Sequence, residues 1–418
     1  MIQDDAVIFG LLMVILGFVF VSSKSDFKPF KVFYRFVPML LMCYFLPSLL
    51  TLSGLINVEE SELYFVATRY LLPACLVLLT LSIDLKGIMG LGPKAVVMFL
   101  TGTVGVVIGG PLAILIIGFF DPELVGGNGP DALWKGLSTI AGSWIGGGAN
   151  QVAMKEIYQP SEQLYSAMVS VDVIVAELWM FFLILGVGQS ARIDKWMKAD
   201  ASNIQALQEK LEKREAETSR IPQTVDLIAI GAVAFGAVAY SKFAAYGLAP
   251  TIKSNFAWAT RFSLDSEFFW LIVLSTTIGL GLSFTKLRRL EHCGASKIGT
   301  VFIYILVAVI GMRMDVMALF KQPELFLVGI VWMLIHVVLL FFVAWLIRAP
   351  YFFLAVGSKA NIGGAASAPV VAGAFHPSLA PVGVLLAVLG YALGTYAAWI
   401  CSQMMRAVSP ADLPIPPT

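Results

Sequence analysis

Two acidic side chains, Asp172 and Glu177, lie in the middle of a long apolar segment near residues 162–188. An ionised side chain at the centre of a bilayer costs on the order of 3 kcal/mol on insertion scales, so such residues usually face a cavity and mark the path of an ion or a proton. Their spacing places them on different faces of a helix, so they need not serve one site. Asp172 is therefore the first candidate for an ion or proton site. Glu177 is the second candidate, and its alternative role is a structural pair with a base or an amide.

Two stretches of small and polar residues interrupt other apolar segments, one in each half of the chain. Glycine weakens a helix by about 1 kcal/mol relative to alanine, so the consecutive glycines at 146–148 predict an unwound helix. Pro369 removes a backbone donor in the second stretch. The stretches are Gly142-Ser143-Trp144-Ile145-Gly146-Gly147-Gly148-Ala149-Asn150-Gln151 and Gly357-Ser358-Lys359-Ala360-Asn361-Ile362-Gly363-Gly364-Ala365-Ala366-Ser367-Ala368-Pro369.

Broken transmembrane helices in corresponding places of two half-proteins indicate the binding site of a transporter. Unwound backbone frees carbonyl oxygens that coordinate Na⁺, and the N-termini of half-helices attract anions. The alternative is close helix packing through small residues, as in GxxxG contacts. Na⁺ is placed at Asn150, Asn361 and Asp172. The full set of predicted substrate or ion ligands is Ser143, Gly146, Gly147, Asn150, Gln151, Asp172, Ser358, Asn361, Gly363, Gly364, Ser367 and Thr395.

Two candidate residues, His336 and Thr395, lie in apolar segments of the second half. His336 could carry a proton, although a lone histidine on an apolar helix is more often a hydrogen-bonded packing residue. Thr395 belongs to the motif Gly390-Tyr391-Ala392-Leu393-Gly394-Thr395-Tyr396, whose glycines allow close approach of another helix. Packing against the second broken helix is the expected role of this motif, and a substrate contact from Thr395 is the alternative.

The composition is that of a membrane protein: 58% of the 418 residues are hydrophobic and 13% are charged. Soluble domains carry about 25% charged residues. The formal net charge of +1 gives no basic surface for nucleic acid. The four cysteines form no CxxC pair, the three histidines form no HExxH motif, and no Walker A sequence is present. We therefore expect no cofactor other than a coupling ion, Na⁺ or H⁺, and no use of ATP.

Hydrophobicity divides the chain into twelve segments, near 5–23, 36–57, 63–83, 95–120, 132–156, 162–188, 223–246, 267–285, 296–319, 323–347, 350–374 and 378–405. Lysine and arginine in short loops mark the cytoplasmic side. Their positions in the first half, Lys155 included, predict an outside N-terminus, and those in the second half, ending at Arg406, predict an inside C-terminus. Twelve simple crossings cannot satisfy both. We expect 11 or 13 segments, with a half-span in 247–266 or a segment that enters and returns.

The two halves resemble each other weakly, since Ile145-Gly146-Gly147 aligns with Ile362-Gly363-Gly364. The opposite orientation of these segments is typical of inverted repeats. The predicted organisation is a first transmembrane repeat at 1–188, a soluble polar linker helix at 189–222 and a second repeat at 223–418. The predicted fold class is an all-α polytopic membrane protein with inverted repeats and two crossed, broken transmembrane helices.

The motifs at 142–150, 358–369 and 390–396 resemble those of the DUF819 family of membrane proteins, and Asp172 falls where that family has an aspartate. The resemblance covers nearly the whole chain apart from the linker, and the first motif departs from it at Gly148-Ala149, where a bulkier pair is expected. The family is distantly similar to the folds of bile-acid/sodium symporters and cation–proton antiporters, in which two unwound helices cross at the membrane centre. This resemblance implies a transporter but does not imply a substrate.

Two classes of function compete. The first is a secondary active transporter in a bacterial inner membrane that couples a small organic solute to Na⁺ or H⁺ by an elevator-type movement; organic anions, amino acids and cell-wall-derived peptides are its candidate substrates. The second is an intramembrane enzyme acting on lipid or peptide, or a channel. An enzyme needs a nucleophile–base pair or a metal cluster, and no spacing in the sequence ties Asp172, Glu177 and His336 together, so we expect no enzyme. The expected partners are a small-molecule substrate and the lipid bilayer, without nucleic acid, and a homodimer is left open.

Overall fold

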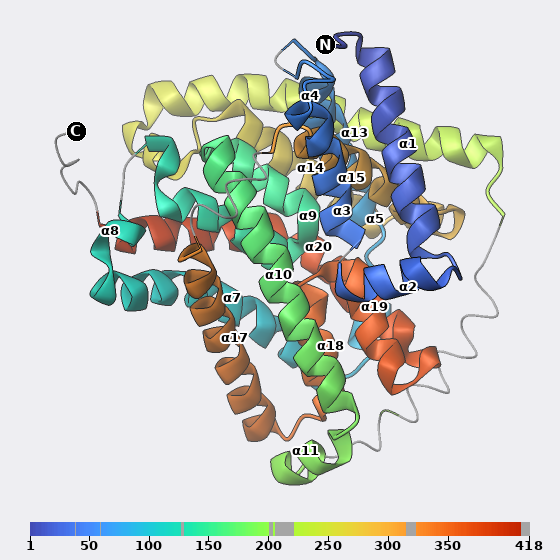
Figure 1. Ribbon diagram of the computed structural model, residues 1–418, viewed down its shortest axis with the longest axis vertical. Helices are drawn as coiled ribbons and strands as arrows, with labels where there is room; N and C mark the ends of the chain where they lie inside the picture. Colours follow the sequence, from blue (N-terminus) through green and yellow to red (C-terminus); the bar gives the residue numbers. More distant parts are fainter. Residues whose placement is uncertain are drawn as a thin grey trace.

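The computed structural model describes residues 1–37, 39–58, 60–126, 129–199, 204, 221–314 and 323–410. The regular elements of these residues are helices, and one isolated bridge joins Ile2 to Ile56. Seven of the described helices are long and apolar enough to cross a membrane, or up to nine if each bent pair counts as one span. The prediction of an all-α polytopic membrane protein is confirmed (Figure 1).

The first half contains these elements in chain order: α1 (Asp5–Ser23), α2 (Lys28–Phe36), α3 (Met39–Leu52), α4 (Leu63–Val66), a π turn (Ala67–Leu71), α5 (Leu72–Leu81), α6 (Leu85–Met89), α7 (Pro93–Phe120), α8 (Pro122–Val125), a 3₁₀ turn (Gly129–Asp131), α9 (Leu133–Tyr158), α10 (Glu162–Val187) and α11 (Ser190–Met197). The second half contains α13 (Thr224–Asn255), η3 (Ala257–Phe262), α14 (Glu267–Ser283), η4 (Lys286–Cys293), α15 (Ala295–Gly311), α17 (Leu325–Ile347), α18 (Tyr351–Asn361), α19 (Gly364–Phe375), η5 (Pro377–Leu379) and α20 (Ala380–Val408).

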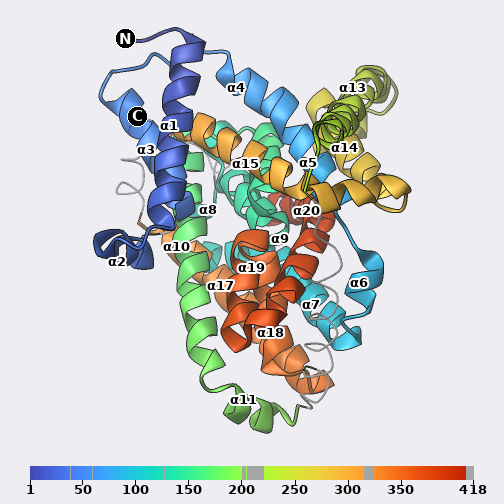
Figure 2. The same cartoon turned by 90° about the vertical axis from the view of Figure 1, so that its right-hand side faces the viewer.

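These helices form two bundles, and each half of the chain contributes to both (Figure 2). In the α5 bundle, α5 packs against α13, α14 and α15, and α1 and α3 lie beside α15. Every residue of α5 is buried, because this helix is apolar on all sides. In the α20 bundle, α20 packs against α7, α9, α18 and α19, and α10 and α17 complete the group. Each predicted repeat, 1–188 and 223–418, therefore contributes helices to both bundles.

The first broken segment doubles back on itself. Gly147 interrupts α9 with φ +74° and ψ −176°, a conformation that favours glycine. A straight helix would hold Trp134 and Tyr158 about 36 Å apart, yet their ring centroids lie 5.3 Å apart. The backbone N–H of Ser161 also donates to the carbonyl of Pro130 across the base, at 2.9 Å. The segment is a re-entrant helical hairpin, called hairpin 1 here, with its tip at Gly147.

The second broken segment has the same form. The α18 and α19 helices meet at Gly363 and Gly364, whose φ values are +106° and +58°. Phe375, at the end of α19, lies 5.2 Å from Phe352 and 6.0 Å from Tyr351, at the start of α18, between ring centroids. This pair of helices is hairpin 2. Both predicted helix breaks are present, and the arms return beside each other at each break.

The two hairpins point at each other from opposite ends of α20. The base of hairpin 2 adjoins the start of α20, where a Cβ on Gly373 would lie 3.9 Å from the Cβ of Ala380. The base of hairpin 1 adjoins its other end, because Gln403 Nε2 donates to Tyr158 Oη at 2.9 Å and the guanidinium of Arg406 lies 5.5 Å from the Trp134 ring. Opposite directions of approach are the property that an inverted repeat predicts.

This geometry resolves the conflict between the charge patterns of the two halves. A re-entrant hairpin crosses the membrane no times, and α13 continues to Asn255, so no half-span is needed in 247–266. On this geometry we expect the C-terminus on the other side, because Arg406 lies beside Trp134, at the end of the molecule that carries Asp121, Glu123 and Asp131. The charge pattern also treated Lys155 as a loop residue. Its side chain is instead buried, and its Nζ pairs with Glu162 at 2.9 Å.

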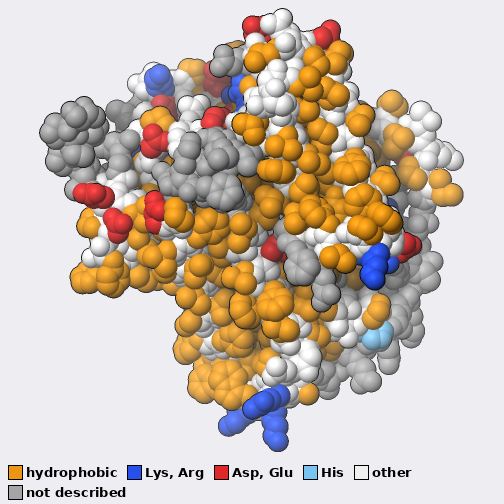
Figure 3. Space-filling model, in the orientation of Figure 1, with side chains coloured by type: hydrophobic (Ala, Val, Ile, Leu, Met, Phe, Trp, Pro, Cys, Tyr) orange, Lys and Arg blue, Asp and Glu red, His pale blue; other side chains and the backbone are white. Residues whose placement is uncertain are grey.

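The surface agrees with this orientation. Figure 3 shows hydrophobic side chains over most of one face, acidic ones near α8 and basic ones over α11. Basic residues belong on the cytoplasmic side, so we expect α11 on the inside. Of the predicted linker helix, the structure describes α11 and Ile204; Leu207 and Leu211, on which the predicted amphipathic face depends, lie outside the described residues.

Both termini are therefore expected on the outer side. Single cysteines introduced as Ile2→Cys and Ser409→Cys should react with a membrane-impermeant maleimide added to intact cells, whereas Lys198→Cys should react only after the membrane is permeabilised. The native cysteines are all buried and provide a low background. Labelling of positions 2 and 409 from opposite sides would contradict the double-hairpin topology.

Candidate functional site

The tips of the two hairpins meet against the middle of α20. A Cβ on Gly390 would lie 2.9 Å from the carbonyl oxygen of Ile145 in hairpin 1 and 3.3 Å from that of Ala360 in hairpin 2. A Cβ on Gly394 would fall 2.5 Å from the Cα of Gly146. The glycines of the 390–396 motif thus bring one helix against both breaks, as the sequence predicted for the second break alone.

Tyr391 lies between the two tips. Its ring carbon Cε1 is 3.2 Å from the Cβ position of Gly147, and its hydroxyl oxygen is 3.8 Å from the Cβ position of Gly364. Both glycines have positive φ, so their left-handed backbone and their missing side chains leave room for this ring. One side chain of α20 therefore touches the first turn after each break. The sequence analysis gave Tyr391 only a packing role.

Asp172 joins the two arms of hairpin 1. Its Oδ1 accepts a hydrogen bond from Trp144 Nε1 at 2.6 Å, before the break, and its Oδ2 accepts one from Gln151 Nε2 at 2.9 Å, after it. Ser143 lies beside the same carboxylate. Asp172 is 5% exposed. The predicted ligands Ser143, Gln151 and Asp172 are thus brought together, and the carboxylate supports the shape of the tip.

Asn150 also bridges elements at this tip. Its Nδ2 donates to the carbonyl of Gly146 across the break at 2.8 Å, and its Oδ1 accepts from Thr395 Oγ1 of α20 at 2.7 Å. The Thr395 hydroxyl is in turn 3.2 Å from Thr276 Oγ1 of α14, in the other bundle. The amide oxygen of Asn150 retains one lone pair for a further ligand.

Asn361 has a different position from the one that the sequence suggested. Its Nδ2 donates to the carbonyls of Phe99 at 2.9 Å and Gly357 at 3.0 Å, and its Oδ1 accepts from Thr103 Oγ1 at 2.7 Å. It therefore fastens α18 to α7. In the glycine alignment of the two motifs, the residue equivalent to Asn150 is Ser367, not Asn361.

Ser358 and His336 form a second buried connection. Trp179 Nε1 donates to Ser358 Oγ at 2.8 Å, and Ser358 Oγ lies 2.9 Å from His336 Nε2. His336 Nδ1 lies 3.1 Å from the carbonyl of Gly102, which can only accept. The consistent assignment is a neutral imidazole that donates through Nδ1 and accepts the Ser358 proton at Nε2. These contacts connect α10, α17, α18 and α7 inside the α20 bundle.

Lys359 is a site residue that the sequence analysis left out of its set. It is fully buried in hairpin 2, and its Nζ donates to the carbonyl of Ala176 on α10 at 2.9 Å. Glu177 Oε1 is 3.8 Å away, so Glu177 is the structural partner of a base. Lys359 and Asp172 are also within electrostatic range of each other. A lysine inside an apolar stretch is the sequence signal that could have identified it.

Ser367 faces the tip of hairpin 2. Its residue is 8% exposed, and its Oγ has no hydrogen-bond partner among the described residues. A Cβ on Gly363 would lie 2.1 Å from this oxygen and 3.3 Å from Lys359 Nζ. Gly363 and Gly364 therefore form a turn that has an ammonium group and a free hydroxyl on one side.

A polar cluster joins the base of hairpin 1 to the α5 bundle. Tyr64 hydrogen-bonds Glu156, and Arg69 Nη2 lies 3.3 Å from Glu156 Oε2. Lys155 Nζ is 3.1 Å from Tyr64 Oη and 2.9 Å from Glu162. Closer to the tip, Tyr44 Oη donates to Gln151 Oε1 at 3.3 Å. The contacts of Tyr64, Arg69 and Tyr44 cross from one bundle to the other and would have to break if the bundles moved apart.

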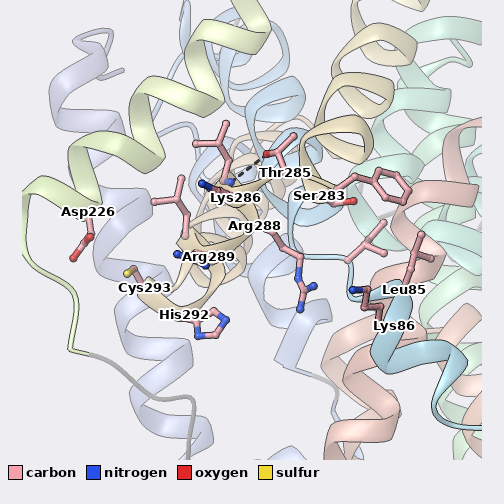
Figure 4. Close-up of a pocket in the computed structure, with 14 residues that line it drawn as sticks. Leu85, Lys86, Asp226, Ser283, Thr285, Lys286, Arg288, Arg289, His292 and Cys293 are labelled. Carbon is pink, nitrogen blue, oxygen red and sulfur yellow. Dashed lines mark hydrogen bonds between the residues drawn. The ribbon is translucent and has the colours of Figure 1, made fainter.

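A cavity of about 890 Å³ lies between α6 and η4, beside the start of α13, and is called the η4 cavity here. Figure 4 shows Lys86 of α6 near Arg288 of η4, with Arg289 and His292 further along. Arg288 pairs with Asp84 at 3.1 Å. None of the site residues predicted from the sequence lines this cavity, but its basic character would favour anions.

Comparison with known proteins agrees with this description. The family described as "Protein of unknown function (DUF819)" matches residues 10–408. The chain is also similar to a curated protein of Bacillus subtilis (strain 168), "Uncharacterized membrane protein YjcL", with 25% identity over 354 residues, which cover 81% of this chain and 82% of the relative. This integral membrane protein, with its two opposed helical hairpins, therefore belongs to the DUF819 family.

Proposed function

We propose that this protein is a secondary active transporter that moves a small organic solute across a bacterial inner membrane, driven by Na⁺ or H⁺. The observation that carries the proposal is the meeting of two re-entrant hairpins, from opposite ends of α20, at one point beside Gly390. Paired helix breaks at the centre of an inverted repeat provide free carbonyls for cations and helix N-termini for anions. Either hairpin would form one side of a path that opens to one face of the membrane.

The two bundles are the units that would move relative to each other during transport. The α20 bundle contains both tips and is fastened internally by Asn361, Ser358 and His336, so it can move as a unit. Its described hydrogen bonds to the α5 bundle involve side chains, for example Thr277 Oγ1 to Tyr396 Oη at 2.7 Å. An elevator-type displacement of the α20 bundle along the α5 bundle would expose the tips alternately.

The coupling cation is assigned to hairpin 1. The groups gathered there are oxygen acceptors: the carbonyl of Ile145, the amide oxygen of Asn150 and the carboxylate of Asp172. A cation at this position would compensate the negative charge of the buried Asp172 carboxylate. Na⁺ would be held by these oxygens directly, whereas H⁺ would be carried by Asp172.

An enzyme is the competing class, and the Ser358–His336 pair is the arrangement that would favour it. A serine nucleophile must reach a substrate carbonyl, with its base held by a third group. Here both side chains are fully buried, and the Ser358 oxygen also accepts from Trp179. The pair fits a packing contact of the α20 bundle, and we propose no catalytic role for it.

The transport proposal can be tested by locking the bundles together. Thr276 and Thr395 lie in different bundles with their hydroxyl oxygens 3.2 Å apart, so the variant Thr276→Cys/Thr395→Cys should form a disulfide on oxidation. In proteoliposomes with an imposed Na⁺ or H⁺ gradient, solutes that raise the unfolding temperature of the purified protein should accumulate against their own gradient. Oxidation should stop this uptake, and a reductant should restore it.

Each single-cysteine variant is the control, and its uptake should be the same in oxidant and in reductant. Thr395→Cys also loses the hydrogen bond to Asn150, so every variant is compared with itself under reducing conditions. Uptake that merely equilibrates the solute and ignores the ion gradient would indicate a channel. Chemical conversion of the solute by the purified protein would indicate an enzyme. Unchanged gradient-driven uptake in the cross-linked protein would exclude movement of one bundle along the other.

A further inference from the structure

We propose that the tip of hairpin 2 binds a carboxylate group of the transported solute, between Lys359, Ser367 and the first turn of α19. This inference rests on the proposed transport function and names the chemical class of the substrate. It assigns the anion to hairpin 2 and leaves the cation to hairpin 1.

The first support is the incomplete pairing of Lys359. An ammonium group has three N–H donors, and burial of a charge is costly unless it is paired. The contacts described for Lys359 Nζ are the carbonyl of Ala176 at 2.9 Å and a loose ion pair with Glu177 at 3.8 Å, and Asp172 attracts it from a distance without a hydrogen bond. The Glu177 side chain is 42% exposed, so solvent weakens its attraction. The buried cation thus retains a donor for another anionic group.

The second, independent support is the hydroxyl of Ser367. A buried polar atom without a partner costs stability, and in a native structure it calls for an explanation. Ser367 Oγ is such an atom among the described residues, and it lies on the same side of the Gly363 turn as Lys359 Nζ. A carboxylate oxygen between these two groups would satisfy both donors.

The third support is the start of α19. This helix has twelve residues and no side-chain N-cap, because its N-cap position is Gly363. The first-turn N–H groups and the helix dipole favour an anion at this end. Tyr391 Oη approaches the same turn, 3.8 Å from the Cβ position of Gly364, and hydrogen-bonds the backbone of Ala365; its own O–H can donate to a bound anion.

The comparison with hairpin 1 explains why the two tips differ. At the position equivalent to Ser367, Asn150 hydrogen-bonds Gly146 and Thr395 and keeps only an acceptor lone pair on Oδ1, and Asp172 supplies a negative charge beside hairpin 1. Hairpin 1 therefore presents acceptors, whereas hairpin 2 presents donors and a positive charge. The basic side chains around the η4 cavity, among them Lys86 and Arg289, would likewise attract an anionic solute.

The test uses the full-length protein in detergent and measures thermal unfolding with sodium salts at constant ionic strength. The carboxylate probes are acetate, succinate, citrate, L-glutamate and the dipeptide alanyl-alanine; chloride, sulfate and phosphate are the inorganic anions. At least one carboxylate should raise the unfolding temperature in a saturable manner, and the inorganic anions should not. Protection by phosphate or sulfate equal to that by every carboxylate would assign the tip to inorganic oxyanions and overturn the proposal.

The deciding variant is Ser367→Ala, and its matched control is Ser275→Ala. Ser275 Oγ is likewise buried without a described partner, but it lies on α14 in the α5 bundle. Both variants remove an unpartnered hydroxyl, so both should fold and unfold at the same or a slightly higher temperature than wild type without ligand. Ser367→Ala should raise the carboxylate Kd by about 10-fold or more, since a hydrogen bond to a charged group is lost. Ser275→Ala should keep the wild-type Kd.

Failure of the inference can be distinguished from failure of the transport proposal. An unchanged carboxylate Kd in Ser367→Ala, or gradient-driven uptake of neutral or cationic solutes without any carboxylate binding, would overturn the anion site and leave transport standing. Carboxylate binding that depends on Ser367, without movement of the ligand across proteoliposomes, would keep the anion site and reject transport. Lys359→Met should also abolish the rise in unfolding temperature caused by carboxylates. This variant is the second test if Ser367→Ala changes the carboxylate Kd only slightly.

Discussion

The variant Asp172→Asn is expected to lose ion-coupled transport and to unfold at a lower temperature, by several degrees. The carboxylate accepts hydrogen bonds from Trp144 Nε1 and Gln151 Nε2, on opposite sides of the helix break. An asparagine offers one acceptor and turns an NH₂ group toward one of these donors. Hydrogen bonds to charged groups contribute about 1.5–3 kcal/mol each, so the arms of hairpin 1 should separate more easily. Thermal unfolding and uptake, each with and without Na⁺, measure the two effects.

Glu177→Gln is the matched control for this prediction. Glu177 lies on the same helix, but its side chain is 42% exposed and its contact with Lys359 is 3.8 Å long. We expect a small change in unfolding temperature. Uptake across a pH series then separates the coupling ions: H⁺-coupled uptake falls as the external pH rises, and Na⁺-coupled uptake requires sodium at every pH. Wild-type stability, coupling and rate in Asp172→Asn would show that this acid is dispensable.

The variant Gly394→Ala is expected to disrupt the contact between α20 and the tip of hairpin 1. The added Cβ would lie 2.5 Å from the Cα of Gly146 and 2.6 Å from Asn150 Nδ2, so the backbones must separate. Overpacking of this kind costs about 1–3 kcal/mol. The Asn150–Thr395 hydrogen bond should lengthen or break, and uptake should fall to a few per cent of wild type or less. Circular dichroism melts and the uptake assay provide the measurements.

Gly236→Ala is the control for the glycine prediction. Gly236 lies in α13, where an added Cβ would meet no atom within 4 Å. Alanine is the better helix former by about 1 kcal/mol, so this variant should be as stable as wild type or more stable, and fully active. If Gly394→Ala retains both stability and uptake, the close approach of α20 to hairpin 1 is not required for function.

The sequence by itself determined the membrane class and the location of the breaks. Hydrophobic content and segment length leave only transmembrane helices for most of this chain. Three consecutive glycines at 146–148 and the pair at 363–364 mark backbone that is weak as a helix, because glycine adopts positive φ without a steric cost, and Gly147, Gly363 and Gly364 do have positive φ. The cost of a charge in the bilayer singled out Asp172, which does connect the arms of hairpin 1.

Only the tertiary structure decided whether the chain continues in the same direction or turns back after each break. A glycine turn permits both a kink and a reversal, and a 26-residue segment such as α9 is long enough to cross or to return. The choice depends on packing against α20, which is far away in the sequence. The expected number of crossings and the expected side of the C-terminus follow from that choice. The partners of the polar residues depend on the same packing: Asn361 bonds to α7, Ser358 to His336, and Lys359 shares one turn with Ser367. Hydrogen bonds between distant helices follow from three-dimensional proximity, and no local pattern of one sequence records that proximity.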